Sequence, residues 1–322
     1  MRSLMRVVGL IGLLLWPATS FGQEFPNRPI RFIVPFPAGG PSDVISRVLT
    51  AKMASILGQP VVVENRAGAG GLTGIAYVAR SEPDGYTIAI APSSGLAMNV
   101  TLRDDMPFDP RKDLALITQI VSVPELFVVN EKVPANTLAE LVALAKAQPG
   151  KLTFASTGAG GMPHMAMELL ELTAGIKLVH APYTGAAPAV NDLLGGHVDM
   201  MFADVPVLLG AIQSGKVRAL AIGSKKRLDT LPSVATTAEL GMPQVEADNW
   251  YGLVAPAATP RPVLDKLYAA ATAALHSDEV KAKLAPQGVV TVGNPSAEFS
   301  SYVQHEIERW GKLIKATGIK IK

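Results

Sequence analysis

Residues 32–49 read FIVPFPAGGPSDVISRVL, and they join an apolar strand to a helix through a short loop rich in Pro and Gly. The continuous apolar run is typical of a strand that is covered on both faces. The loop at residues 36–43 contains no Lys, Arg, Cys or His. If this loop binds a ligand, its backbone must supply the contacts.

The same arrangement occurs a second time along the chain, since AGG at residues 38–40 matches AGG at residues 159–161. In the first block the strands IRFIVPF, PVVVEN and TIAIAP alternate with helical segments. In the second block KLTFAS, IKLVHAP and MMFAD do the same. Each block predicts a βαβαβ unit, in which helices cover both faces of a parallel sheet. The sequence therefore predicts an α/β protein with two lobes.

The segment that follows the second block contains no third copy of this unit. It offers two further strands, KVRALAIGS and NWYGLVAP, and then three helices, so we expect it to return to the first lobe. The connections between the lobes are predicted near residues 119–127 and 218–225, with a ligand cleft between the lobes. The first lobe is thus predicted to comprise residues 23–122 and 224–322, and the second residues 123–223.

The N-terminal 22 residues have a different character from the rest of the chain. Two arginines precede a short apolar run, and small residues follow it, which predicts a secretory signal peptide at residues 1–22. The remaining chain has 27 basic and 27 acidic residues and no polybasic run, so nothing indicates nucleic acid or a membrane surface as a partner. The absence of cysteine excludes disulfides, thiol nucleophiles and iron–sulfur clusters.

The two glycine loops lie where open parallel sheets bind ligands, beyond the carboxyl ends of the strands. Glycine lets a ligand approach the backbone closely, and the helix that follows presents free N–H groups and a positive dipole end. Two such loops facing each other would grip one carboxylate through backbone donors alone. The alternative is that both are ordinary turns, with Ser42 or Asp43 capping the first helix.

Other kinds of site fit the sequence less well. The segment VVVENRAGAGGLTG has its third glycine one position late for a dinucleotide-binding fingerprint. The five histidines show no metal-ligand spacing, which predicts neither a metal site nor a cofactor. Ser93 and Ser94 end a strand, but nothing in the sequence links them to a His and an acid, so a serine hydrolase is only a minor alternative.

Four residues near the predicted cleft allow two interpretations each. His164 begins a helix beside the second loop, where it would contact the ligand or stabilise the helix start. Trp250 and its neighbour Tyr251 would line the cleft or pack at a lobe interface. Asp204 would bind an amine or hydroxyl of the ligand, or cap the helix that follows it.

Several segments resemble those of one known family of receptors. They are RPIRFIVPFPAGGPSDVISR (residues 28–47), STGAGGMPH (156–164), HAPYTGAAPAVNDLLGGHVDMMF (180–202) and WYGLVAPAATP (250–260). With them the chain resembles the tripartite tricarboxylate transporter substrate-binding proteins, the Bug-type periplasmic solute receptors. The resemblance covers essentially all of the chain after residue 22.

This resemblance implies a two-lobed, type II periplasmic binding fold, in which each lobe is a mostly parallel sheet flanked by helices. It also implies that the loops after the first strand of each lobe hold one carboxylate of the ligand, partly through ordered waters. Two departures from the family pattern matter. Thr184 stands where a lysine is expected, and Ala203 and Asp204 replace a frequent Asp-Asn pair, which argues against a highly charged tricarboxylate such as citrate.

The function predicted from these observations is capture of a small mono- or dicarboxylate, aromatic acids included, and its delivery to a membrane transporter. The chain is predicted to be a periplasmic monomer without enzymatic activity, metal or cofactor. It would contact transporter subunits transiently, without nucleic acid or insertion into the membrane. A ligand-sensing subunit for a membrane signalling kinase remains the first alternative. The predicted binding residues are Phe36, Ala38, Gly39, Gly40, Ser42 and Asp43 in the first loop, Ser156, Thr157, Gly158, Gly160, Gly161 and His164 in the second, and Ser93, Ser94, Gly95, Tyr183, Thr184, Asp204 and Trp250 at other strand ends.

Overall fold

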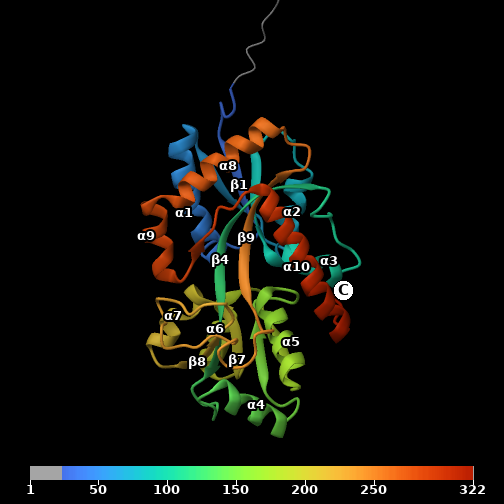
Figure 1. Ribbon diagram of the computed structural model, residues 1–322, viewed down its shortest axis with the longest axis vertical. Helices are drawn as coiled ribbons and strands as arrows, with labels where there is room; N and C mark the ends of the chain where they lie inside the picture. The colour runs from blue at the N-terminus through green and yellow to red at the C-terminus, as the bar shows by residue number, and fades with distance from the viewer. Residues whose placement is uncertain (1–23, 322) are drawn as a thin grey trace, which may run out of the picture.

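A computed structural model describes residues 24–321 of the chain and shows an elongated molecule (Figure 1). The predicted signal peptide at residues 1–22 lies outside the described residues. Two groups of strands and helices are stacked along the long axis, an upper one that holds the start and end of the described chain and a lower one formed by its middle part. The two-lobed α/β architecture is confirmed.

The upper lobe begins with the first predicted βαβαβ unit. Strand β1 lies between β2 and β3 and is parallel to both. Helix α1 starts directly after the glycine loop, because Gly40 is its extended N-cap and Pro41 takes the first helical position, where its missing N–H costs nothing. The elements are β1 (Ile30–Val34), α1 (Pro41–Leu57), β2 (Val61–Asn65), the 3₁₀ turn η1 (Ala69–Gly71), α2 (Leu72–Ala79), β3 (Thr87–Pro92), the π-helical turn η2 (Ser94–Met98) and α3 (Asn99–Leu102).

The lower lobe contains the second unit in the same arrangement. Strand β5 lies between β6 and β7, again parallel to both, so the order β6-β5-β7 matches β2-β1-β3. This correspondence confirms the repeat that the sequence predicts. The elements are α4 (Leu138–Ala147), β5 (Thr153–Ser156), α5 (Met162–Ala174), β6 (Val179–Pro182), α6 (Ala186–Gly195), β7 (Met200–Asp204), α7 (Val205–Gln213) and β8 (Val217–Ile222).

Two long antiparallel strands connect the lobes, β4 (Leu114–Asn130) and β9 (Asp248–Pro256). β4 pairs with β9 over its first half and with β7 and β8 over its second half, so it passes from one sheet into the other. The first connection therefore lies where it was predicted.

The second connection differs from its predicted position at residues 218–225. β8 still pairs with β4 in the lower sheet, and the segment after it stays there, with Leu228, Leu231 and Val234 packed on the core of α6 and α7. The chain crosses only at β9, which begins at Asp248. We therefore propose that the lower lobe extends to about residue 247 rather than to 223.

The C-terminal part of the chain returns to the upper lobe, as expected. Helix α8 packs on α1, and α10 packs on η2, α3 and β4. Figure 1 shows α8 and α9 at one side of the upper lobe and the end of α10 reaching toward the lower lobe. The elements are α8 (Arg261–His276), α9 (Asp278–Leu284), the 3₁₀ turn η3 (Ala285–Gln287), β10 (Val290–Thr291) and α10 (Ser296–Thr317).

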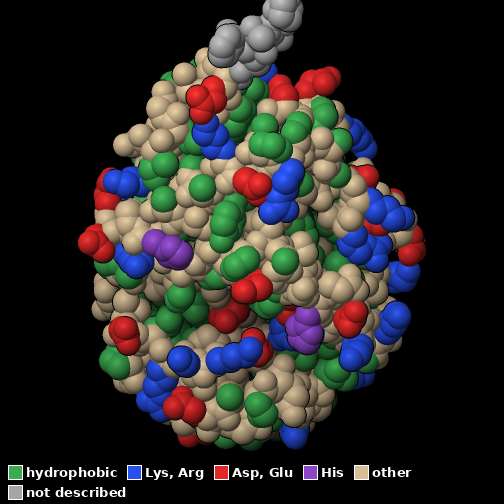
Figure 2. Space-filling view, turned by 45° about the horizontal axis from the view of Figure 1, so that its top comes forward, with side chains coloured by type: hydrophobic (Ala, Val, Ile, Leu, Met, Phe, Trp, Pro, Cys, Tyr) green, Lys and Arg blue, Asp and Glu red, His purple; other side chains and the backbone are tan. Residues whose placement is uncertain are grey.

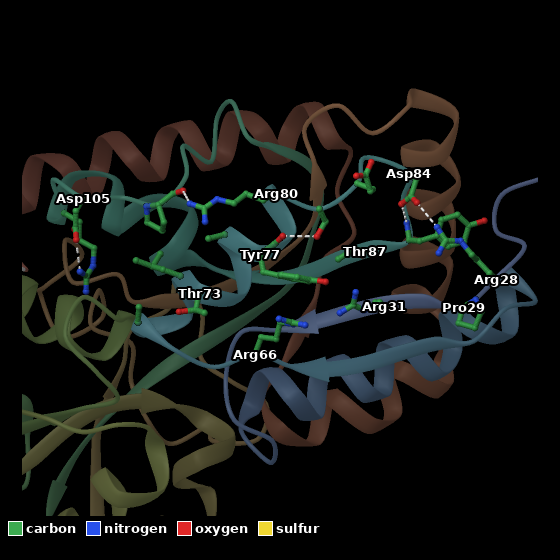
Figure 3. A pocket seen from close by; sticks show the side chains of 18 residues that line it. Arg28, Pro29, Arg31, Arg66, Thr73, Tyr77, Arg80, Asp84, Thr87 and Asp105 are labelled. Carbon is green, nitrogen blue, oxygen red and sulfur yellow. Dashed lines mark hydrogen bonds and ion pairs between the residues drawn. The ribbon is translucent and has the colours of Figure 1, made fainter.

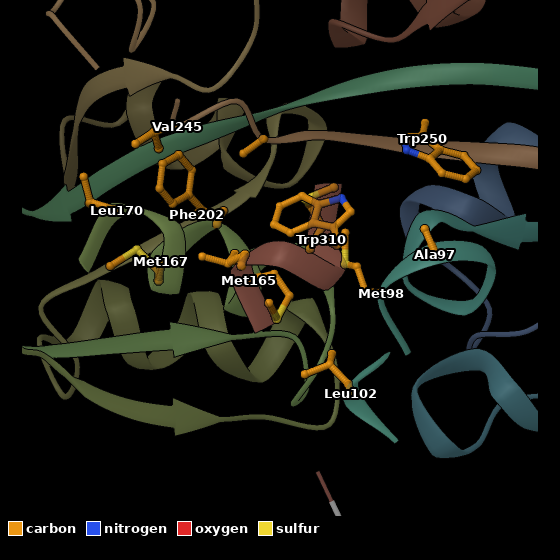
Figure 4. Packing of buried hydrophobic residues seen from close by; sticks show 14 of the residues in the cluster. Ala97, Met98, Leu102, Met165, Met167, Leu170, Phe202, Val245, Trp250 and Trp310 are labelled. Atoms are coloured by element: carbon orange, nitrogen blue, oxygen red, sulfur yellow. The ribbon is translucent and has the colours of Figure 1, made fainter. Parts of the chain in front are cut away.

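One buried apolar cluster extends through both lobes. Met98 and Leu102 of the upper lobe belong to the same cluster as Met165 and Phe202 of the lower lobe, and Trp310 of α10 lies among them (Figure 4). The lobes are therefore joined by packed side chains as well as by two strands.

The surface carries charges of both signs. Figure 2 shows acidic and basic side chains interspersed over the viewed face, as expected from balanced charge in the chain after residue 22. Within residues 24–321, no helix combines the length and the apolar character needed to cross a bilayer.

Candidate functional site

The first glycine loop turns sharply between β1 and α1. Gly39 has a φ of +85°, a conformation that a residue with a Cβ adopts only at a cost, and no atom lies within 4 Å of the position its Cβ would take. Residues 37–39 are exposed. The sharp turn and the exposed backbone are the features that a ligand-binding loop of this type requires.

Asp43 holds this loop in place. Its carboxylate accepts hydrogen bonds from the Gly39 N–H (3.0 Å), from the amide of Asn65 (2.9 Å) and from two nitrogens of Arg47. Burial alone would raise the pKa of Asp43, but the bonds from Arg47, Gly39 and Asn65 outweigh it and keep the pKa below its usual value. Asp43 therefore fixes the conformation of the loop. The N-cap of α1 is Gly40, so neither Ser42 nor Asp43 takes this position.

Backbone donors remain available after these contacts. Within the described residues, no hydrogen-bond acceptor is recorded for the N–H groups of Ala38, Gly40 and Ser42. The side chain of Ser42 is buried, and it lies in the first turn of α1. These three N–H groups lie at the positive end of the helix dipole, where an anion is favoured.

The second loop is organised by a histidine instead of a carboxylate. Nδ1 of His164 accepts a hydrogen bond from the Gly160 N–H (3.1 Å), so its proton is on Nε2, which lies 3.3 Å from Glu168. Gly160 therefore cannot offer its N–H to a ligand in this arrangement. Of the two interpretations of His164, the structure favours the stabilising one.

A stack of three rings supports this loop from below. The rings of His164 and His180 are stacked with centroids 4.0 Å apart, and the Phe154 ring lies nearly parallel to both, with its centroid 4.7 Å from that of His180 and 6.3 Å from that of His164. Oγ of Ser156 lies 2.6 Å from Nε2 of His180. Burial, with His164 nearby, lowers the pKa of His180 to about 4, so this ring is neutral at pH 7.

The second loop also leaves donors free. The N–H groups of Thr157, Ala159 and Met162 have no acceptor among the described residues, whereas Gly158 and Gly161 bond within the loop. Each loop thus leaves at least three backbone N–H groups without an acceptor among the described residues, and neither loop contains Lys or Arg.

The second loop directly meets the upper lobe. A Cβ on Gly160, which has a φ of +78°, would lie 3.1 Å from Oδ1 of Asn99, 3.3 Å from Leu102 and 2.7 Å from Ile321. Asn99 and Leu102 lie in α3, just beyond β3, and Ile321 belongs to the C-terminal segment. The second loop therefore lies against α3 and the C-terminal segment of the upper lobe.

A buried polar cluster connects the lobes at the crossing strands. Asn249 of β9 accepts a bond from Ser93 (3.0 Å) and donates to Asp204 at the end of β7 (2.9 Å), and the hydroxyl of Tyr251 donates to the other oxygen of Asp204 (3.3 Å). Sequence reasoning missed Asn249, and it considered Tyr251 only as a residue of the cleft wall or a lobe interface. Ser93 bonds to an amide and not to a histidine, which removes the basis for a serine hydrolase.

Glu125 of β4 completes this cluster. Both of its carboxyl oxygens are buried without a hydrogen-bond donor. Burial and the negative charge of Asp204 raise the pKa of Glu125 well above its usual value, while burial raises the pKa of Asp204 to about 6 despite the bonds that it accepts. Burial thus favours the protonated form of both carboxyl groups. The acidic residue within the apolar run VPELFVV was the sequence signal for Glu125.

The remaining predicted residues differ in burial and in their hydrogen-bond partners. Tyr183 donates its hydroxyl to Asp192 of its own lobe, and Thr184 next to it is exposed. Trp250 is fully buried, and its Nε1 donates to Glu306 of α10 (3.2 Å), which favours packing over lining of the cleft. Phe36, Ser94 and Gly95 pack around η1, η2 and α2.

This two-lobed fold, with a glycine loop after the central strand of each parallel unit, is typical of proteins that bind a solute between two lobes. The model of the tripartite tricarboxylate transporter family receptors matches residues 45–319. The chain belongs to this family, whose members are binding proteins and not enzymes.

Individual relatives show how far the similarity extends. Protein BugT of Bordetella pertussis is 38% identical over 98% of this chain and 99% of its own length. The structure of R. palustris Rpa4515 with adipate matches with a TM-score of 0.87 at 31% identity, covering 92% of this chain and 99% of that one. MatC of Rhodopseudomonas palustris with bound malate matches with a TM-score of 0.84 at 31% identity, covering 90% and 100%.

Proposed function

We propose that this protein is an exported receptor that captures a small carboxylic acid between its lobes and delivers it to a tripartite tricarboxylate-type membrane transporter. The observation that carries the proposal is the pair of loops at residues 36–43 and 156–164, each of which has at least three backbone N–H groups without an acceptor among the described residues. Neither loop contains Lys or Arg. Such loops suit a single carboxylate, because amide donors can surround it closely without a competing counter-charge.

The energies are sufficient without a cationic side chain. Hydrogen bonds to a charged group contribute roughly 1.5–3 kcal/mol each, and each helix N-terminus adds about 0.3–1 kcal/mol. Four such bonds and two helix ends therefore supply about 7–14 kcal/mol. A micromolar complex requires roughly 8 kcal/mol, so the upper part of this range also covers the cost of ordering the ligand.

The rest of the ligand is proposed to be uncharged or to carry one further acid group. Thr184 is exposed beside the second sheet and provides no positive charge, and Asp204 adds negative character at the crossing strands. Two structurally similar proteins contain adipate and malate, which are small dicarboxylates. We propose mono- and dicarboxylates as the ligand class, aromatic acids included.

The proposed location is the periplasm, and the proposed state is a monomer. The signal-like segment at residues 1–22 and membership in a family of transporter receptors support export. Delivery of the ligand then requires only transient contact with the transporter.

The proposal is tested by a thermal-shift screen of the purified protein against malate, adipate, benzoate, citrate and their amides, followed by calorimetry. A ligand that binds the native state raises the melting temperature. We expect the mono- and dicarboxylates to stabilise the protein, and citrate and the matched amides to have no effect. Equal stabilisation by an acid and its amide would contradict recognition of a carboxylate.

A further inference from the structure

A recess whose lining includes neither glycine loop lies along one side of α2 in the upper lobe. It has a volume of about 900 Å³ and is lined by residues from before β1, from α2, and from the segments before β3 and after α3. Figure 3 shows that its side chains are spread along an elongated surface. We call it the arginine groove, defined by Arg28, Arg31, Arg66, Tyr77, Arg80 and Arg103.

Tyr77 organises the middle of the arginine groove. The guanidinium of Arg66 lies 3.8 Å from the centre of the Tyr77 ring, and that of Arg31 lies at 5.3 Å. Glu64 accepts bonds from both arginines. Stacking and ion pairing fix these guanidinium planes in advance, so little conformational entropy is lost when they bind a further acidic group.

Several donors in the groove are not used within the described residues. Arg66 bonds to Glu64 through Nε, which leaves its two terminal nitrogens without a recorded hydrogen-bond partner. Arg80 is exposed, and one of its terminal N–H groups donates a hydrogen bond to the backbone oxygen of Pro107. Nε of Arg103 is buried without a partner, and its nearest acidic contact, Asp105, lies at 3.8 Å. Buried guanidinium nitrogens without acceptors are costly, so an incoming acceptor is favoured.

The distribution of charge indicates the shape of the occupant. Glu64, Glu82, Asp84 and Asp105 lie in or beside the groove, so its formal charge is only one positive unit. Figure 3 places Asp84 and Asp105 at opposite ends, with Tyr77 and Arg80 between them. Positive donors spaced along the middle fit an extended chain with carboxylates at intervals better than one compact anion. Arg and Tyr are also the residues that are enriched at protein interfaces.

We propose that the arginine groove docks an acidic segment of a partner protein. All of its lining residues belong to the upper lobe, so the groove keeps its shape if the lobes move relative to each other. The inference does not depend on which acid binds between the lobes.

The test uses a fluorescein-labelled peptide of six glutamates and fluorescence anisotropy of the purified protein. We expect binding that weakens as NaCl rises from about 50 to 300 mM, and at least a ten-fold loss of affinity in the double variant Arg66→Gln, Arg80→Gln. The matched control is Arg261→Gln with Lys266→Gln, which removes two exposed positive charges from α8. It should change the affinity less than two-fold.

Each remaining outcome overturns the proposal. Absence of peptide binding to the wild type, or equal losses in both double variants, would leave no specific site. If inorganic phosphate or citrate binds the groove more tightly than the peptide does, the groove is a site for small anions. If phosphatidylglycerol vesicles bind and the peptide does not, the partner is a lipid surface. A Gly39→Ala variant should retain peptide binding, which separates this result from failure of the inter-lobe site.

Discussion

Replacement of Gly39 by alanine tests whether the backbone of the first loop binds the ligand. Gly39 has a φ of +85°, and no atom lies within 4 Å of the new Cβ, so the cost is conformational and not steric. An L-residue in the left-handed region costs roughly 1–2 kcal/mol. The loop can avoid this cost by relaxing, which turns the N–H groups of Ala38 and Gly40 away from their present directions.

The expected effect follows from the number of bonds that are lost. One hydrogen bond to a carboxylate is equivalent to roughly 1.5–3 kcal/mol, and about 1.4 kcal/mol changes an equilibrium constant ten-fold. Loss of one bond should therefore raise the dissociation constant by about 10- to 100-fold. Because the carboxylate is common to all ligands, every acid that binds should be affected by a similar factor.

Gly241 provides the matched control for this variant. It has a φ of +82°, and its Cβ would also meet no atom within 4 Å, but it lies between β8 and β9, away from both glycine loops. Gly39→Ala and Gly241→Ala should lower the melting temperature by similar amounts, whereas only Gly39→Ala should weaken binding in calorimetry. Wild-type affinity in Gly39→Ala would refute the proposed role of the first loop.

Three further changes test the groups around the site. Asp43→Asn should lower the affinity for every acid ligand by a similar factor, since Arg47 and the loop lose their shared carboxylate acceptor. Because folding lowers the pKa of Asp43, this carboxylate stabilises the protein above its ordinary pKa of 3.8, and the stabilisation is lost as the pH falls. The melting temperature of the variant should therefore decrease less at low pH than that of the wild type. Glu125→Gln should raise the melting temperature at pH 8 and reduce its decline from pH 5 to 8. Folding raises the pKa of this carboxyl group, so the group favours the native state at low pH and destabilises it as the pH rises. An unchanged pH dependence of the melting temperature would count against the buried acid pair. Trp250→Phe should change ligand affinity by less than two-fold and lower the free energy of unfolding by about 1–3 kcal/mol, because the hydrogen bond to Glu306 is lost. A large loss of affinity would show instead that Trp250 lines the cleft.

Much of the fold could be predicted because local signals and long-range packing agree in the two repeated units. The apolar strands β1 and β5 are each followed by a glycine loop and a helix with proline near its start, so strand, turn and helix are all encoded within a short segment. Within the two loops the backbone turns through positive φ at Gly39, Gly158 and Gly160, as the glycine content predicts, whereas Gly40 and Gly161 are extended N-caps.

The crossing of the second connection was less predictable. β8 and β9 are both apolar segments that pair with β4, and their sequences do not show which half of β4 each one joins. The choice depends on pairing between residues distant in the chain. The position of Trp250 has a related cause, because neighbours in a strand face opposite sides of the sheet. Asn249 and Tyr251 take the polar side, so Trp250 is directed into the apolar core.

The apolar cluster shared by the two lobes has a consequence for protein engineering. Met98 and Leu102 bury themselves against residues that the other half of the molecule supplies, and Trp310 fills the space between them (Figure 4). Cutting the chain into two separately expressed halves would expose this seam to water at a cost of about 25 cal/mol per Å² of apolar surface. A chimera that takes its lower lobe from a relative with another ligand should therefore also take α3 and the end of α10 from that relative. The side chains that pack between the lobes would then come mainly from one protein.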